Sequence, residues 1–104
     1  MARFDVFTDP QDPERKHTPY FLDVQNDYID QLATRVMVPL RREAMFGPRP
    51  RKPNPLLVFG TDAVVLDTAA LGAVPLSELR QPVGHLRDAR ADILEALDTL
   101  FGAH

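Results

Sequence analysis

Few residues of this sequence have a type and spacing that could carry chemistry. The histidines His17, His85 and His104 have no i,i+4 partner, and the 104 residues include no cysteine, so no zinc-site pattern is present. Ser77 lies outside any nucleophile-elbow sequence, and the five glycines form no phosphate-binding loop. The sequence therefore predicts a protein without catalytic residues, metal or cofactor.

Three aspartates stand close together in one polar segment. Asp23, Asp27 and Asp30 could hold a divalent cation, but no further ligand pattern accompanies them, which favours solvated or turn-capping roles. Tyr28 and Ile29 form an apolar pair within the same segment. Either this pair packs beneath its own loop, or it is an exposed contact for a partner protein.

Charge and hydropathy limit the function classes. The net charge of −3 argues against general nucleic-acid binding, which needs a basic face. No apolar run approaches the roughly 20 residues of a membrane span, and the N-terminus lacks a signal-peptide core, so we expect a cytoplasmic protein. Residues 41–55 hold five basic residues and four prolines. This segment predicts an extended surface connector or a contact for a phosphate or an acidic partner.

The elements that must position these residues are mainly β-strands of one domain over residues 1–104. Gly60-Thr61-Asp62 joins two short apolar runs, which is a hairpin signal. Pro39 cannot donate to a ladder, so we expect it at a strand end or edge; His85 has the pattern of a loop residue. Strands are expected over residues 3–8, 20–24, 35–40, 56–59 and 63–66, a short strand within 68–74, and a helical turn at 75–80.

The C-terminal segment has the clearest pattern, that of an amphipathic helix ending near residue 101. Gly102 is suited to end it in the left-handed conformation, leaving Ala103 and His104 as a tail. The apolar residues at three- and four-residue steps are Leu86, Ala89, Ile93, Leu97, Leu100 and Phe101.

Taken in order, several segments resemble the CcdB toxin family of bacterial toxin–antitoxin modules. The resemblance spans nearly the whole chain; residues 9–18 and 41–55 are the divergent parts. It is carried by Phe21-Leu22-Asp23-Val24-Gln25-Asn26-Asp27-Tyr28-Ile29-Asp30, Arg35-Val36-Met37-Val38-Pro39-Leu40, Phe59-Gly60-Thr61-Asp62, Ala73-Val74-Pro75-Leu76-Ser77 and the helix up to Phe101.

The resemblance implies a mainly β fold with a C-terminal α-helix, an SH3-like partly open barrel of the CcdB/MazF type. It also implies a homodimer that acts without catalysis. Members of this family bind the A subunit of DNA gyrase and trap its cleavage complex with DNA. A CcdA-like antitoxin neutralises them by ordering a disordered segment on the toxin.

The resemblance also implies a partner-binding surface, from which this chain departs in part. The family typically ends in tryptophan-glycine-isoleucine, where this chain has Gly102, Ala103 and His104, and it carries asparagine where this chain has Asp98. A homologue with a lost or changed target is therefore one alternative. Another is a MazF-type ribonuclease, for which Arg35 is the arginine to test. The residues expected to bind target or antitoxin are Tyr28, Ile29, Asp98, Phe101, Gly102, Ala103 and His104.

Overall fold

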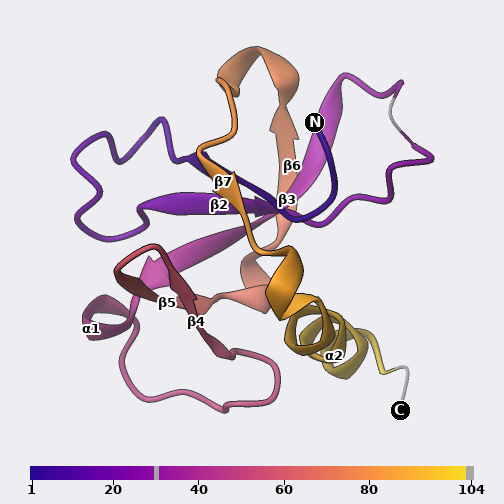
Figure 1. The fold of residues 1–104 in the computed structure, drawn as a ribbon. Coiled ribbons are helices and arrows are strands. Elements are labelled where there is room, and N and C mark those ends of the chain that lie inside the picture. The colour runs from indigo at the N-terminus through magenta and orange to yellow at the C-terminus, as the bar shows by residue number, and fades with distance from the viewer. Residues whose placement is uncertain (30, 103–104) are drawn as a thin grey trace.

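The structure, a computed structural model, describes residues 1–29 and 31–102. These residues form an antiparallel sheet and a C-terminal helix, as the strand and helix patterns predict (Figure 1). The strands are β1 (Asp5–Thr8), β2 (Tyr20–Asp23), β3 (Thr34–Arg42), β4 (Leu56–Phe59), β5 (Asp62–Leu66), β6 (Gly72–Pro75) and β7 (Gly84–His85). The helices are α1 (Glu43–Phe46) and α2 (Arg90–Phe101), with 3₁₀ turns at Thr68–Ala70, Leu76–Glu78 and Arg87–Ala89.

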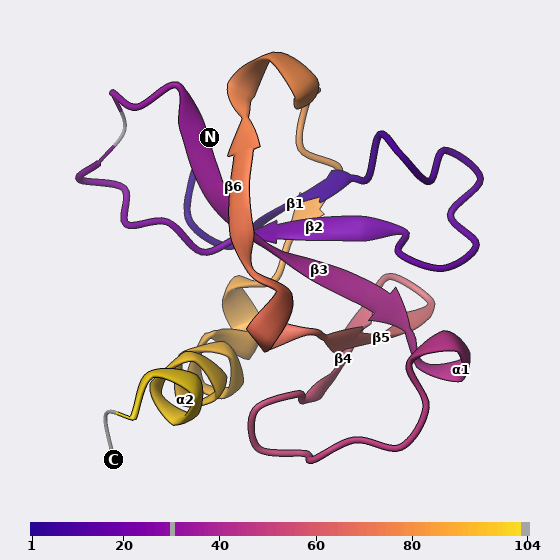
Figure 2. The same cartoon turned by 180° about the vertical axis from the view of Figure 1, so that it is seen from behind.

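The sheet curls into a half-barrel. Its strands follow the order β4-β5-β3-β2-β1-β7, and the long β3 crosses it so that β6 pairs with residues 34–37 and β5 with residues 40–42 (Figure 2). The two edge strands approach each other at one point, where a Cβ built on Gly84 of β7 would lie 2.7 Å from the ring of Phe59 in β4. The partly open barrel expected from the sequence is confirmed.

The core lies inside the curl and beneath α2. Val6, Leu22 and Leu40 on three neighbouring strands have no exposed surface. Ile93 and Ala96 on the inner face of α2 are equally buried and belong to the same cluster. Because apolar burial stabilises by about 25 cal/mol per Å², this contact holds α2 against the sheet.

The expectation that Pro39 marks a strand end or edge is wrong. β3 continues to Arg42 and lies between β2 and β5 in the sheet. In an antiparallel strand the N–H and C=O of one residue point to the same side. The Pro39 carbonyl accepts the Asp67 N–H at 3.0 Å, in the gap where the neighbour of β3 changes from β6 to β5. At this point β3 needs no backbone N–H donor toward β5 or β6, so a proline is tolerated within the strand.

Two short elements were not expected from the sequence. His85 is not a loop residue, because β7 pairs with β1 and brings His85 opposite Asp5. The segment 41–55 is not a surface connector throughout. Its first two residues belong to β3, and the next four form α1. Both elements are too short to produce a periodic pattern, and β7 exists only through its pairing with a strand far away in the chain.

Asp62 links β5 to two other strands. Its Oδ2 accepts the Tyr20 hydroxyl at 2.7 Å, and its Oδ1 accepts Arg42 Nη1 at 2.8 Å. The hydrogen bond from Arg42, followed by that from Tyr20, lowers the pKa of Asp62 below its ordinary value of 3.8. A carboxyl with a lowered pKa in the folded state contributes stability above its unfolded pKa and loses it as the pH falls through the folded pKa.

We expect Asp62→Asn to destabilise the fold by on the order of 1 kcal/mol at neutral pH, because the ion pair with Arg42 is lost. Urea unfolding measures this difference. The difference should vanish in acid below the lowered pKa of the folded carboxyl, where the wild-type side chain is also uncharged. A difference of the same size at both pH values would show that the charge of Asp62 contributes nothing.

Candidate partner-binding site

Large apolar side chains are exposed at two places that the sequence singled out. On the loop that follows β2, Tyr28 is 96% exposed and Ile29 is 49% exposed. At the end of α2, Phe101 is 69% exposed. The alternative that Tyr28 and Ile29 pack beneath their own loop is therefore wrong. Leu32 and Leu100, in the same two segments, are also exposed. Neither was among the residues predicted to bind a partner, although Leu100 was expected on the apolar stripe of the helix.

The loop that follows β2 holds Tyr28 outward through polar contacts of its own. Asn26 Oδ1 accepts the Tyr28 N–H at 2.9 Å, and the Asn26 carbonyl accepts the Ile29 N–H at 3.0 Å. The Gln25 amide donates to the Ile29 carbonyl and accepts the Val36 N–H of β3 at 3.0 Å. An Asx turn and one glutamine thus fix the start of the loop to the sheet, so its apolar pair is presented in an ordered geometry.

A buried ion pair lies directly beneath this loop. Arg35 of β3 is 3% exposed, and its Nε donates to Asp23 Oδ2 at 2.8 Å, while Asp23 has no exposed surface. Arg35 Nη2 also donates to the Gln25 carbonyl at 3.3 Å, and Asp23 Oδ1 accepts the Gln25 N–H at 3.0 Å. The pair joins β2, β3 and the second residue of the loop, Gln25.

Burial and mutual attraction act in opposite directions on the pKa values of the two groups. Burial raises the pKa of Asp23, and the hydrogen bonds from Arg35 and from the Gln25 N–H oppose this change. Burial alone would lower the pKa of Arg35, but the hydrogen bond and charge of Asp23 outweigh it, and the pKa is raised. Since a guanidinium keeps its proton under all ordinary conditions, Asp23 serves as its buried counter-charge. Arg35 and Asp23 are therefore structural.

The apolar stripe of α2 extends past the core. Ile93 and Ala96 are fully buried by the sheet, whereas Leu100 and Phe101 on the last turn are exposed. Gly102 ends the helix with φ 75°, and its N–H donates to the Asp98 carbonyl. This left-handed cap, which favours glycine, is confirmed. Asp98 is exposed on the same last turn.

The predicted partner-binding residues do not form one continuous patch in this chain. Figures 1 and 2 place the loop that follows β2 and the C-terminal end of α2 on the same side of the molecule but at its opposite ends, with the start of α2 between them. Tyr28 and Ile29 lie at one end, and Asp98 and Phe101 at the other. Ala103 and His104 lie outside the described residues.

The groups considered for metal binding and for a ribonuclease site are partly placed by the described residues. Within residues 1–29 and 31–102 no cluster of three or more histidine or acidic side chains could hold a metal ion. Asp23, one of the three aspartates considered for a cation, is committed to Arg35, and Asp30 lies outside the described residues. Arg35 is buried and paired with Asp23, so it is not accessible to an RNA phosphate. Arg35 is therefore not placed to act in a ribonuclease site.

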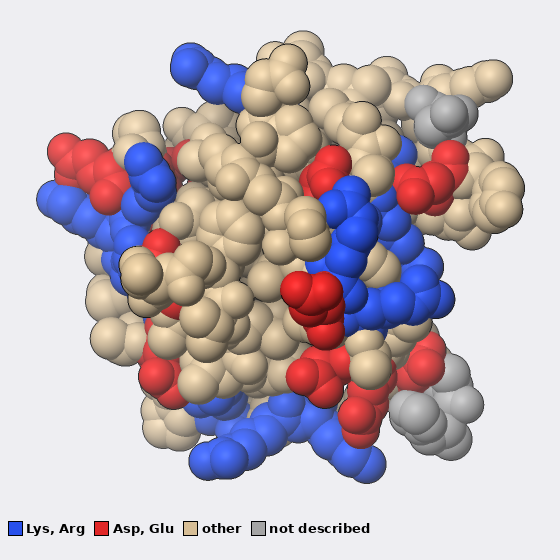
Figure 3. Space-filling view, in the orientation of Figure 1, with Lys and Arg blue, Asp and Glu red and all other residues tan. Residues whose placement is uncertain are grey.

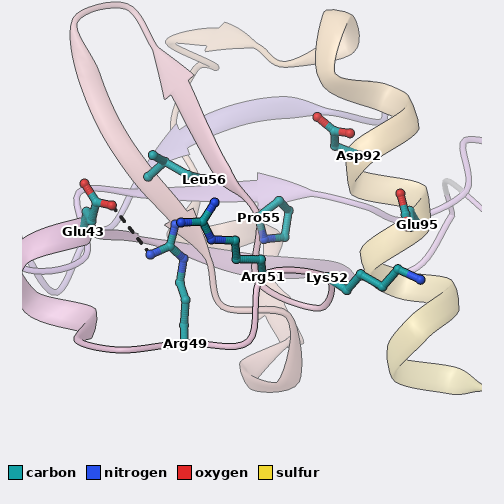
Figure 4. Close-up of a pocket in the computed structure, with 8 residues that line it drawn as sticks. All are labelled: Glu43, Arg49, Arg51, Lys52, Pro55, Leu56, Asp92 and Glu95. Atoms are coloured by element: carbon teal, nitrogen blue, oxygen red, sulfur yellow. Dashed lines mark ion pairs between the residues drawn. The ribbon is translucent and has the colours of Figure 1, made fainter.

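The proline- and arginine-rich segment borders a cavity of about 460 Å³ against α2 (Figure 4). Arg49 approaches Glu43 at 3.6 Å, and its Nε donates to the Asn54 carbonyl. The lining balances three basic side chains with three acidic ones: Arg49, Arg51 and Lys52 with Glu43, Asp92 and Glu95. This balance does not favour a phosphate or an acidic ligand here.

The chain is a small, mainly β protein with a curled half-barrel sheet and a C-terminal helix. It exposes apolar side chains on one loop and at one helix end, as protein-binding domains do. The chain belongs to the CcdB family: the family model described as CcdB protein matches residues 3–102. CcdB proteins are toxins of toxin–antitoxin systems. In addition, the described residues include no helix long and apolar enough to cross a bilayer.

Proposed function

We propose that this chain is the toxin of a type II toxin–antitoxin module and that it acts in the cytoplasm by binding, without catalysis, to the A subunit of DNA gyrase. A CcdA-like antitoxin neutralises it, and the active form is a homodimer. The observation that carries the proposal is the exposed end of the α2 stripe. Leu100 and Phe101 continue a face that is fully buried two turns earlier, and an apolar helix face left uncovered by its own fold marks a protein contact.

The loop that follows β2 supports the same proposal. Tyr28 and Ile29 are exposed, and the contacts around Gln25 and Asn26 hold the backbone of these two residues before any partner binds. A preorganised backbone loses little conformational freedom on binding. Both features fit a toxin whose activity lies in its shape and surface.

The test is expression in bacteria with and without the small open reading frame next to this gene. Expression of the chain alone should arrest growth, and co-expression of the antitoxin should relieve the arrest. The purified chain should retain the breakage–reunion domain of gyrase A in a pull-down assay. Unaffected growth in both strains, or RNA cleavage by the purified chain, would contradict the proposal.

A second candidate is a family member with a different target, and Gly102 favours it. Where the family carries a large aromatic side chain, this chain has a residue with no side chain that forms the left-handed helix cap. Loss of an aromatic hot spot costs about 2 kcal/mol or more of binding free energy. Tight antitoxin binding together with no retention of gyrase A would identify this second candidate.

A further inference from the structure

A cavity of about 420 Å³ lies between the N-terminus, the loop that follows β2 and the start of α2. Three arginines from two distant parts of the sequence line it: Arg3, Arg87 and Arg90. Against them stands one carboxylate, that of Asp27. The cavity therefore carries an excess of positive charge on a chain whose net charge is −3. Figure 3 shows basic side chains gathered on this face beside the start of α2.

Arg3 is held in position before any ligand binds. Its Nε donates to the Val24 carbonyl at 3.1 Å, and its backbone N–H donates to Asp27 Oδ1 at 2.8 Å. The guanidinium carbon lies 5.1 Å from the centroid of the buried Phe4 ring. Two contacts thus fix the side chain and one fixes the backbone, while the terminal nitrogens of the guanidinium have no partner among the described residues.

The two arginines near the start of α2 are placed against the ordinary electrostatics of a helix. The N-terminal end of a helix carries partial positive charge and favours acidic side chains. Here Arg87 and Arg90 stand in that position, and α2 has no side-chain N-cap. Arg87 Nη2 is paired with Asp5 at 2.8 Å, whereas Arg90 has no ion pair with any described residue. Arg90 is therefore available to pair with an incoming anion.

We propose that this arginine cavity, defined by Arg3, Arg87 and Arg90, binds a glutamate or aspartate side chain on an acidic segment of the antitoxin. The proposal rests on the proposed function and names the chemistry of one contact in it. Tyr28 lines the same cavity, so the carboxylate contact is continuous with the exposed loop.

The charges around the cavity favour a peptide carboxylate over a nucleic acid. The first turn of α2 adds Asp92, and Asp88 precedes it, so a polyanionic backbone running past the cavity would meet like charge. A single carboxylate can avoid these groups and still reach the guanidinium groups in a charge-assisted geometry.

The test begins with a probe that does not depend on the antitoxin. An end-blocked peptide of uncharged residues with one central glutamate is titrated into the full chain, and the arginine Nε–Hε resonances are followed by NMR. The same peptide with glutamine in place of the glutamate is the neutral reference. We expect the glutamate peptide to shift the signals of Arg3, Arg87 and Arg90 and high salt to reverse the shifts. Arg90→Gln should weaken the binding by about tenfold. The matched control, Arg51→Gln, removes the same charge from the balanced cavity and should change the affinity by less than about twofold.

The second arm measures the affinity of the cognate antitoxin for the same variants. Arg90→Gln should weaken it by about tenfold. Equal effects of Arg90→Gln and Arg51→Gln, equal binding of both peptides, or tighter binding of a short DNA duplex at these arginines would overturn the proposal. The proposed function has a separate readout, because its failure would appear as an absence of growth arrest.

Discussion

Arg35→Leu is expected to destabilise the fold by about 3–5 kcal/mol, since it leaves Asp23 as a buried charge without its partner. Asp23 has no exposed surface, and among the described side chains Arg35 is its only ion-pair partner. Urea unfolding followed by circular dichroism measures the loss. The loop that follows β2 should loosen at the same time, because Arg35 also donates to the Gln25 carbonyl.

Two comparisons separate this effect from loss of side-chain bulk. The double variant Arg35→Leu/Asp23→Leu should recover much of the stability, because replacing both members of a buried pair with apolar residues is often neutral. Lys16→Leu breaks an ion pair with Glu14 in which the two side chains are 68% and 69% exposed, and it should cost less than about 1 kcal/mol. If the single and double variants were equally unstable, Asp23 would not be the source of the cost.

Phe101→Ala is expected to weaken binding to the antitoxin, and the toxic effect, by about 30-fold, which corresponds to about 2 kcal/mol for an aromatic hot spot. Tyr28→Ala should act in the same direction. The folded chain covers little of either ring, so the free energy of unfolding should change by less than about 0.5 kcal/mol. Isothermal titration with the antitoxin and growth after induction measure the two effects.

Met45→Ala is the matched control for these variants. Met45 is 54% exposed, and it lies on α1, away from the loop that follows β2 and from the end of α2 (Figure 1). Its replacement should leave both the affinity and the growth arrest unchanged. If Met45→Ala weakened binding as much as Phe101→Ala, exposed apolar area in general would explain the contact, and the site would lose its residue specificity.

Much of the fold could be predicted because its signals are local. The apolar alternation of β2 and the Gly60-Thr61 connection of the β4–β5 hairpin act within a few residues. β7 could not be predicted, since two residues carry no period and their strand conformation depends on pairing with β1. Pro39 was misplaced for the same reason: its tolerance depends on the gap between β5 and β6, which exists only in the assembled sheet.

The candidate site divides in a similar way. The sequence marked Tyr28, Ile29 and Phe101 because apolar side chains stood in a polar loop and at the end of an amphipathic helix. It did not indicate Arg35 as a buried partner of Asp23, since a charged residue in a strand pattern is ordinarily exposed. It also did not indicate the arginine cavity, whose members come from opposite ends of the chain.

By itself the sequence determined most of the strands, the helix with its apolar stripe and glycine cap, and the family. These follow from hydrophobic periodicity and backbone preferences, which neighbouring residues encode. The tertiary structure decided which apolar residues stay exposed and which charges meet. Ile93 and Phe101 both belong to the apolar pattern of α2, but the curled sheet covers only Ile93. The part of α2 that the sheet covers depends on the packing of the whole chain, and no local pattern encodes it.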